Sequence, residues 1–377
     1  MIYLDYAAHT PADEAVLQCF CETERRYGAN PNSAHAAGNA ARERLAAMTE
    51  AIAGLLGVDV SEIIYTSGAS EANNTAVRGL AQRARKWGNH ILSTPLEHAS
   101  VSESLEALRR QGFEVENVAV GADGKVVLED LQKRLRADTV LVAVTAVDSE
   151  LGVIQPIREI GEIVHGFPHC RLHVDATQAI GKTAFSFDGI DTASFAPHKF
   201  YGLNGSGVLF KRRGVELEPL IYGGAGATPY RSGTPTLSLA AATETALRLA
   251  LTRVDERLST VRTHCDTLRR ALAAYPLVRF NSPTDAVPHI LNLSVQNVKG
   301  TVFQRMLDEK GVCVSVKSAC SSDGAPSQAV LAVSGDRKNA LSSWRISLSH
   351  LTTADQVQSF LAIFDSCYQA LTGTSLR

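Results

Sequence analysis

The chain has few cysteines, almost no net charge and no long apolar run, and each shortage argues against a class of protein. Seven cysteines among 377 residues are an odd, sparse set, which favours free thiols in a reducing cytoplasm over a disulfide framework. A formal net charge of −2 argues against a nucleic-acid-binding face, which is normally basic. No stretch approaches the roughly 18 apolar residues of a membrane span. The N-terminus enters strand-like sequence directly, without a signal or transit pattern.

Length and element order predict the architecture. A chain of 377 residues exceeds what one hydrophobic core usually supports, so we expect two domains. From Ile63 onward, short apolar strands alternate with helices, which is typical of an α/β fold with a doubly wound, mostly parallel sheet. We assign residues 13–253 to this large domain, and residues 1–12 and 254–377 to a smaller α+β domain. One long amphipathic helix, from about Leu237 to Ala273, is expected to leave the large domain.

The stretch 172–199 carries an acid and a lysine at the ends of two elements. The apolar strand before Asp175 delivers a carboxylate, and Lys199 follows 24 residues later. That separation is about one strand-crossover-strand unit, which would bring both side chains to the same carboxyl edge of a parallel sheet. Such a pair suits pyridoxal phosphate, with the lysine forming a Schiff base and the acid holding the ring nitrogen protonated. A surface salt bridge beside a buried strand is the alternative.

Two polar segments permit both a binding and a structural interpretation. After the strand 63–66, small residues from Ser67 to Asn74 open a helix whose N–H groups would cradle a phosphate; an ordinary helix cap at Ser67 is the alternative. The loop 28–35 contains two asparagines and a histidine suited to holding a carboxylate, although it also reads as a plain connection.

A group of histidines and a cysteine invites a metal interpretation. His165, His169, Cys170 and His173 run from a helix end into a strand, so their side chains would not face one point. We therefore expect no metal site.

Eight segments, in this order, resemble the cysteine desulfurases of the class V aminotransferase group, which are fold type I pyridoxal-phosphate enzymes. The segments are Tyr3-Leu4-Asp5-Tyr6-Ala7-Ala8, Thr66-Ser67-Gly68-Ala69-Ser70-Glu71-Ala72-Asn73-Asn74, Glu97-His98, His173-Val174-Asp175-Ala176-Thr177-Gln178, His198-Lys199, Arg231-Ser232-Gly233-Thr234, Ser318-Ala319-Cys320-Ser321-Ser322 and Arg345-Ile346-Ser347-Leu348. The Ser-Ala-Cys-Ser form is similar to the branch of the family with a mobile catalytic-cysteine loop.

The resemblance implies pyridoxal 5'-phosphate as cofactor. Lys199 would form the Schiff base, Asp175 would pair with the ring nitrogen, and Gln178 would hydrogen-bond the phenolic oxygen. His98 would stack on the ring, and Thr234 of a second subunit would contact the phosphate, which implies a homodimer. The implied cofactor-binding set is Ala69, Ser70, His98, Ser149, Asp175, Gln178, His198, Lys199 and Thr234.

The resemblance also implies the reaction. Lys199 would move protons at Cα, assisted by His98, while Arg345 would grip the carboxylate of L-cysteine as a bidentate fork, helped by Asn30. Cys320 would take the sulfur as a persulfide and leave L-alanine. The sulfur would then pass to an acceptor protein for iron–sulfur cluster assembly or tRNA thiolation.

Four positions depart from the family pattern. Ser149 stands where an asparagine usually contacts the phenolic oxygen, and Ala196-Pro197 precedes His198 where a serine hydroxyl usually reaches the phosphate. Lys317 replaces a glycine and His9 replaces a threonine. Each lost neutral hydrogen bond is worth on the order of 1 kcal/mol. Two alternatives therefore stand beside the desulfurase: another transaminase or lyase of the same fold, and a binding or scaffold protein with a weakened cofactor site.

Overall fold

A seven-stranded sheet forms the centre of the larger half of the molecule. The computed structural model describes residues 1–224, 228–316 and 325–374. The sheet has the order β2-β8-β7-β6-β5-β3-β4, and all its pairings are parallel except those of β8, which runs antiparallel to β2 and β7. Its strands are β2 (Ile63–Thr66), β3 (His90–Ser93), β4 (Glu114–Asn117), β5 (Thr139–Thr145), β6 (Arg171–Asp175), β7 (Thr192–Phe195) and β8 (Gly207–Lys211). This confirms the predicted mostly parallel α/β sheet.

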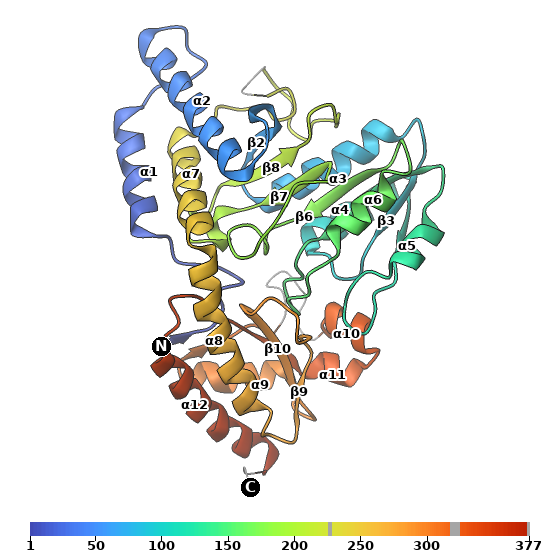
Figure 1. Cartoon of the computed structure of the whole chain (residues 1–377), viewed down its shortest axis with the longest axis vertical. Helices are drawn as coiled ribbons and strands as arrows, with labels where there is room; N and C mark the ends of the chain where they lie inside the picture. The colour runs from blue at the N-terminus through green and yellow to red at the C-terminus, as the bar shows by residue number, and fades with distance from the viewer. Residues whose placement is uncertain (225–227, 317–324, 375–377) are drawn as a thin grey trace.

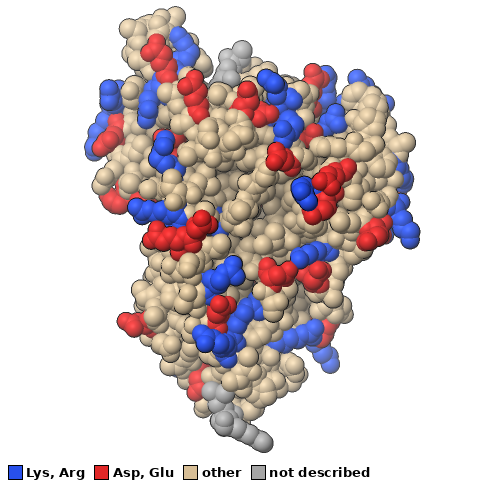
Figure 2. All heavy atoms as spheres, viewed as in Figure 1, with Lys and Arg blue, Asp and Glu red and all other residues tan. Residues whose placement is uncertain are grey.

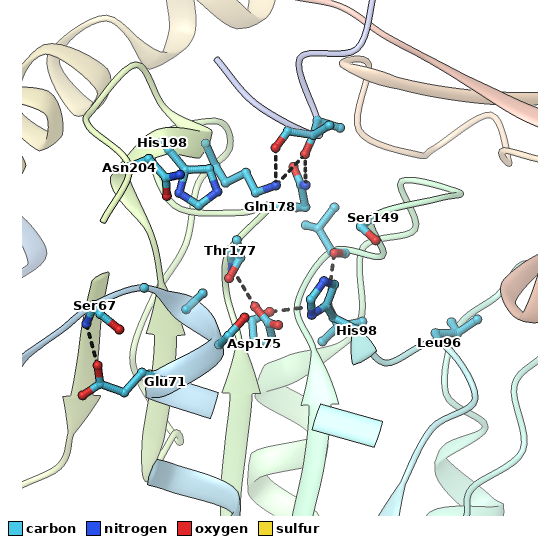
Figure 3. A pocket seen from close by; sticks show the side chains of 18 of the residues that line it. Ser67, Glu71, Leu96, His98, Ser149, Asp175, Thr177, Gln178, His198 and Asn204 are labelled. Carbon is cyan, nitrogen blue, oxygen red and sulfur yellow. Dashed lines mark hydrogen bonds between the residues drawn. The ribbon is translucent and has the colours of Figure 1, made fainter. Parts of the chain in front are cut away.

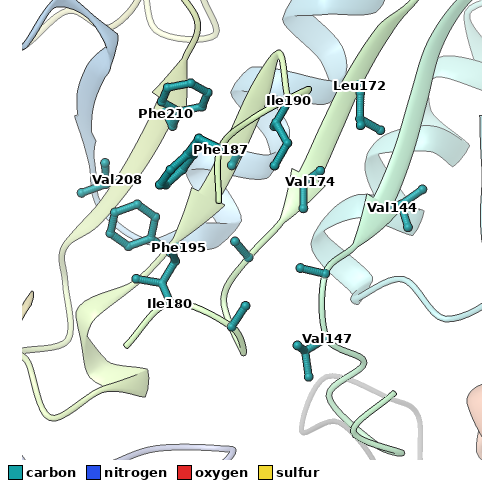
Figure 4. Packing of buried hydrophobic residues seen from close by; sticks show 14 of the residues in the cluster. Val144, Val147, Leu172, Val174, Ile180, Phe187, Ile190, Phe195, Val208 and Phe210 are labelled. Atoms are coloured by element: carbon teal, nitrogen blue, oxygen red, sulfur yellow. The ribbon is translucent and has the colours of Figure 1, made fainter. Parts of the chain in front are cut away.

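Helices cover both faces of this sheet (Figure 1). The helices of this half are α1 (Glu14–Arg26), α2 (Ala36–Leu56), α3 (Ala69–Ala84), α4 (Ala99–Arg110), α5 (Leu128–Arg134), α6 (Ile157–Val164) and α7 (Leu237–Thr252). Alternate residues of β5 enter different cores: Val142 and Val144 pack with α6 and α7, whereas Leu141 and Ala143 pack with α3 and α4. Strands buried on both faces need apolar residues at nearly every position, which explains their continuous apolar runs. Figure 4 shows the first of these cores, including Phe195.

The chain ends form a second, smaller assembly. The N-terminal strand β1 (Ile2–Tyr3) pairs in parallel with β11 (Val312–Cys313), and β10 (Ile290–Val295) pairs antiparallel with β9 (Val278–Phe280) and β12 (Ser343–Ser347). Its helices are α8 (Val254–Leu272), α9 (Gly300–Glu309), α10 (Gln328–Ser334), α11 (Arg337–Ser342) and α12 (Ala354–Thr372). A separate core surrounds the buried Trp344. The predicted residue boundaries of the two domains stay a prediction.

The single long helix predicted over 237–273 is wrong. The structure divides it into α7 and α8 at Arg253, whose φ of −121° and ψ of 14° lie outside the helical region. Asp255 and Glu256 in the first turn of α8 favour a new helix start, because acidic groups there complement the helix dipole. The break falls where the chain passes from the larger half to the smaller one (Figure 1).

Charged side chains of both signs are interspersed over the face shown in Figure 2. A surface of this kind accords with the formal net charge of −2. In the described ranges, every helix is too short or too polar to cross a membrane.

Candidate functional site

A cavity of about 390 Å³ lies at the carboxyl ends of the central strands (Figure 3). It is large enough for a small cofactor together with a substrate. Nine residues of the predicted site line it, namely Ala69, Ser70, His98, Ser149, Asp175, Gln178, His198, Lys199 and Arg345. They come from segments throughout the chain, so the cavity exists only in the folded protein.

The prediction that Asp175 and Lys199 lie at the same edge of the sheet is confirmed. Strands β6 and β7 are parallel neighbours, and β6 ends at Asp175. The short 3₁₀ helix η2 (Pro197–Lys199) follows β7 and carries Lys199 to the same edge. Both side chains therefore face one cavity.

The N-terminal segment holds the lysine. The Lys199 ammonium donates to the carbonyl oxygens of Ala7 at 2.9 Å and Ala8 at 2.7 Å. Sequence reasoning missed these contacts because they depend on carbonyl positions set by tertiary structure. Both alanines lie in the segment 3–8, which resembles the family pattern. That resemblance was the signal in the sequence that could have pointed to them.

A buried amide connects the acid to the histidine. The Asn73 amide donates to Asp175 Oδ2 and to Ser100 Oγ, both at 2.8 Å, and the Thr177 N–H donates to Asp175 Oδ1 at 3.0 Å. His98 caps α4, its Nδ1 accepting from the Ser100 backbone N–H at 3.1 Å and lying 2.9 Å from Ser100 Oγ. Because Nδ1 accepts a hydrogen bond from a backbone N–H, it carries no proton, and we assign the ring proton to Nε2. Asn73 is a site residue that we missed.

The start of α3 provides the anion cradle. Its N-cap is Gly68, which makes no side-chain capping bond, and both Ala69 and Ser70 line the cavity. The Ser67 cap is therefore wrong; the Ser67 N–H instead donates to Glu71 at 2.8 Å. Uncapped N–H groups at the positive end of a helix favour phosphate. A Cβ on Gly207 would lie 2.5 Å from the Gly68 carbonyl carbon, so β8 can lie this close only with glycine there.

Arg345 reaches the cavity from β12. Its Nη1 donates to the Ser149 carbonyl oxygen at 2.6 Å, and its Nη2 forms an ion pair with Asp5 at 2.9 Å. The side chain is 3% exposed, and its Nε has no hydrogen-bond partner in the described chain. The guanidinium is thus fixed in place beside the cavity.

Gln178 is oriented by a residue that sequence reasoning missed. The partly buried Lys182 donates to Gln178 Oε1 at 2.7 Å, and Gln178 Nε2 donates to the Ala7 carbonyl oxygen at 2.8 Å. These two bonds fix which end of the amide carries its donor. Burial, with Lys199 and Arg345 nearby, lowers the pKa of Lys182 well below its usual value.

His198 and two carboxyl groups titrate unusually. Burial, with Lys199 close by, lowers the pKa of His198 to about 4, so its ring is neutral at pH 7. His9 stacks on it at 5.6 Å between ring centroids. Burial raises the pKa of Glu97 to about 8, and burial together with Glu150 raises the pKa of Asp148 to about 7.

Several predicted residues are not brought to the cavity by this single chain. Asn30 uses its Oδ1 to accept from the Asn32 N–H at 2.9 Å in the loop between α1 and α2, and it does not line the cavity. Thr234 does not line it either, and its role from a second subunit stays a prediction. Ala196 is buried and outside the lining. Cys320 and Lys317 lie outside the described residues.

The three histidines of the segment 165–173 contact different partners. His165 contacts Asp191 at 3.2 Å, His169 stacks on Trp87, and His173 hydrogen-bonds Asn73 at 3.0 Å. In the described ranges, the one group with metal-ligand spacing is His90, Glu114 and Glu116, at the opposite edge of the sheet. Arg136 and Arg134 already pair with these two carboxylates.

The described residues fit pyridoxal phosphate. Asp175 offers a buried carboxylate for a ring nitrogen, the start of α3 offers N–H groups for a phosphate, and Lys199 offers an amine. His198 Nδ1 is buried without a partner in the described chain. Fold and site together define a fold type I pyridoxal-phosphate enzyme.

Comparison with known proteins gives the family. The aminotransferase class-V family model matches residues 2–360, so the chain belongs to that family, whose cofactor is pyridoxal 5'-phosphate. It is 36% identical to a NifS/IcsS protein homolog of Lactobacillus delbrueckii subsp. bulgaricus, over 98% of this chain and 97% of the relative. It is 33% identical to the cysteine desulfurase IscS of Dictyoglomus turgidum, over 98% and 95%. A solved NifS-like protein, 32% identical, superposes with a TM-score of 0.91 over 99% of this chain and 100% of that one.

Proposed function

We propose that this enzyme is a cysteine desulfurase that converts L-cysteine to L-alanine and carries the released sulfur as a persulfide on Cys320. The observation that carries the proposal is one cavity of about 390 Å³ that combines Asp175 and Lys199 with Arg345. The first two suit the cofactor, and the third suits an amino-acid carboxylate. The similarity to an enzyme named as a cysteine desulfurase supports the same assignment.

The cofactor-binding roles follow from charge and hydrogen bonding. When bound, pyridoxal phosphate withdraws the electron pair released at the substrate Cα. Asp175, held by the Asn73 amide and the Thr177 N–H, would pair with the ring nitrogen. Gln178 has a second amide proton for the phenolic oxygen, since its first goes to Ala7. Ala69, Ser70 and neutral His198 would hold the phosphate.

Proton movement falls to two side chains. Lys199 would move the proton at Cα, because it lines the cavity from the short helix η2. His98 presents its Nε2–H as an acid, because its Nδ1 is engaged with Ser100. Ser149 lines the cavity and would offer its hydroxyl there.

One protein thiol is sufficient for the sulfur transfer. The Cys320 thiolate bonds to the substrate sulfur, the Cβ–S bond breaks, and the electron pair left at Cβ takes a proton to give alanine. The substrate carboxylate would pair with Arg345, whose guanidinium presents further donors beyond those given to Ser149 and Asp5. The persulfide then passes its sulfur to an acceptor protein for iron–sulfur clusters or tRNA thiolation.

A homodimer would complete the phosphate site. Thr234 adjoins a groove of about 880 Å³ that both Gly233 and Pro235 line, outside the catalytic cavity. The groove mixes apolar residues such as Leu45 and Tyr230 with basic ones, which suits a second copy of the chain carrying Thr234 to the neighbouring cavity.

The six described cysteines are free, which supports work in a reducing cytoplasm.

A Cys320→Ala variant tests the proposal. We expect the wild type to release alanine and, with a reductant, sulfide from L-cysteine, and the variant to lose this turnover while keeping the cofactor's visible absorbance. Cys21→Ala, at an exposed cysteine, is the matched control and should stay active. Full turnover in Cys320→Ala would favour a transaminase or lyase of the same fold. Purified protein that never binds the cofactor would favour a scaffold role.

A further inference from the structure

The loop 200–206 joins the short helix η2 to β8 and carries one polar residue, Asn204, into the wall of the catalytic cavity. Ser67, Ala69 and His198 line the same cavity. Figure 3 shows the Asn204 side chain beside His198, on the side of the view where Ser67 also lies. The loop therefore brings an uncharged amide to the part of the cavity where the phosphate of the cofactor is expected.

The backbone keeps this loop next to the start of α3. β8 pairs antiparallel with β2, the strand that precedes α3. A Cβ on Gly207, the first residue of β8, would lie 2.5 Å from the carbonyl carbon of Gly68, the N-cap of α3. Asn204 comes three residues before Gly207, and three residues span at most about 11 Å. Asn204 therefore lies in the neighbourhood of the N–H groups of Ala69 and Ser70.

The amide of Asn204 has a defined donor end. The Gly205 N–H donates to Asn204 Oδ1 at 2.9 Å, which identifies Oδ1 as the acceptor and Nδ2 as the donor. Gly205 has a φ of +82°, a conformation that favours glycine, so the sequence supports this turn. Among the described residues, none accepts a hydrogen bond from Nδ2. Both N–H groups of Nδ2 are thus available to an acceptor in the cavity.

The phosphate site of this chain lacks a donor that the family usually has. Ala196 stands where a serine hydroxyl usually reaches the phosphate, and the next residue, Pro197, has no N–H. His198 carries no charge at pH 7, because burial and the nearby Lys199 lower its pKa to about 4. A phosphate has three strong acceptor oxygens. A further donor at this side of the cavity would therefore strengthen its binding.

We propose that Asn204 is a ligand of the cofactor phosphate and takes the place of the missing serine hydroxyl. Its Nδ2 would donate to the phosphate that Ala69, Ser70 and His198 are proposed to hold, so the inference rests on that proposed site. The alternative for an exposed asparagine is a solvated turn residue, which would contribute nothing to cofactor binding. The two cases differ in whether the effect of Asn204 depends on the phosphate group.

Pyridoxal, which lacks the phosphate, separates these cases. The full-length protein, freed of cofactor with a trapping amine, is titrated with pyridoxal phosphate and with pyridoxal, and visible absorbance reports binding. In Asn204→Ala, the Kd for pyridoxal phosphate should rise about tenfold, while the Kd for pyridoxal stays unchanged. Asn204→Asp should weaken binding of pyridoxal phosphate further, because a carboxylate repels the phosphate. Asn117→Ala, at an exposed asparagine of β4, is the matched control and should bind both ligands as the wild type does.

The remaining outcomes each overturn a definite statement. An unchanged Kd for pyridoxal phosphate in Asn204→Ala, or an equal loss for both ligands, would exclude Asn204 as a phosphate ligand while leaving the proposed function intact. A wild type that binds the two ligands equally well would exclude the phosphate site at α3, and the inference with it. Because Asn204 is exposed, its variants should fold, and an unchanged thermal midpoint of the cofactor-free protein checks this.

Discussion

The side-chain amide of Asn73 donates to the Asp175 carboxylate at 2.8 Å and to Ser100 Oγ at the same distance. One buried residue of α3 therefore connects Asp175, the acid proposed to pair with the ring nitrogen, to the hydroxyl that contacts His98. Asp175 and His98 are consequently held as one unit.

Replacing Asn73 with alanine should weaken cofactor retention. The change removes a donor to Asp175, a loss worth about 1–3 kcal/mol for a buried, charged acceptor. We expect the cofactor to dissociate on the order of tenfold faster, as measured by loss of visible absorbance on dilution with a trapping amine. Gln82→Ala, at the far end of α3, is the control. Equal dissociation rates for the two variants would show that this amide does not support Asp175.

Replacing Arg345 with lysine should impair substrate binding. A single ammonium cannot reproduce the contacts to Ser149 and Asp5 and also grip a carboxylate with two parallel bonds. The KM for L-cysteine should rise about tenfold or more, while the cofactor's absorbance stays unchanged. Arg279→Lys, at an exposed arginine on β9 of the same small sheet, should behave as wild type. An unchanged KM in Arg345→Lys would remove it from the substrate site.

Glu97 should make stability fall as the pH rises. Its pKa is raised from 4.5 to about 8 by burial, so between these values the folded protein keeps a proton that the unfolded chain loses. The contribution is fully present below pH 4.5 and is lost on rising through pH 8. Glu97→Gln, which cannot ionise, should gain up to about 1.4 kcal/mol per pH unit relative to wild type in that window.

Urea unfolding of the holoenzymes between pH 5 and pH 8 measures this difference. Glu103→Gln, at an exposed glutamate of the following helix α4, is the matched control and should track the wild type. Parallel curves for Glu97→Gln and wild type would mean that the buried carboxyl does not hold its proton.

Adding a methyl group at Gly207 should damage the phosphate cradle. A Cβ there would lie 2.5 Å from the carbonyl carbon and 2.6 Å from the Cα of Gly68, which precedes α3. Backbone cannot move aside as a flexible side chain can, so Gly207→Ala should destabilise the protein by roughly 1–3 kcal/mol and weaken cofactor binding. Gly54→Ala in α2, where nothing lies within 4 Å, should instead stabilise by about 0.5–1 kcal/mol. Calorimetry and cofactor titration measure both; unchanged cofactor affinity in Gly207→Ala would contradict the expectation.

The sequence determined much of the fold and the chemical character of the site. Apolar runs separated by helical periodicity predicted the alternating strands and helices, because local backbone preference and burial act over a few residues. The 24-residue spacing of Asp175 and Lys199 predicted that both could lie at one sheet edge, because neighbouring parallel strands end at the same edge. The resemblance to the family then indicated nine of the residues that line the cavity.

Tertiary structure decided the contacts between elements. Asn73 and the Ala7 carbonyl act on the site through partners 102 and 192 residues away in sequence. Such contacts depend on strand order, above all on β8 lying antiparallel between β2 and β7, and on helix rotation. The helix break at Arg253 likewise follows no glycine or proline signal. Residue types and their order thus determined which chemical groups the chain carries. Packing determined which other residues hold those groups in position, because distant contacts become favourable only once the whole fold has formed.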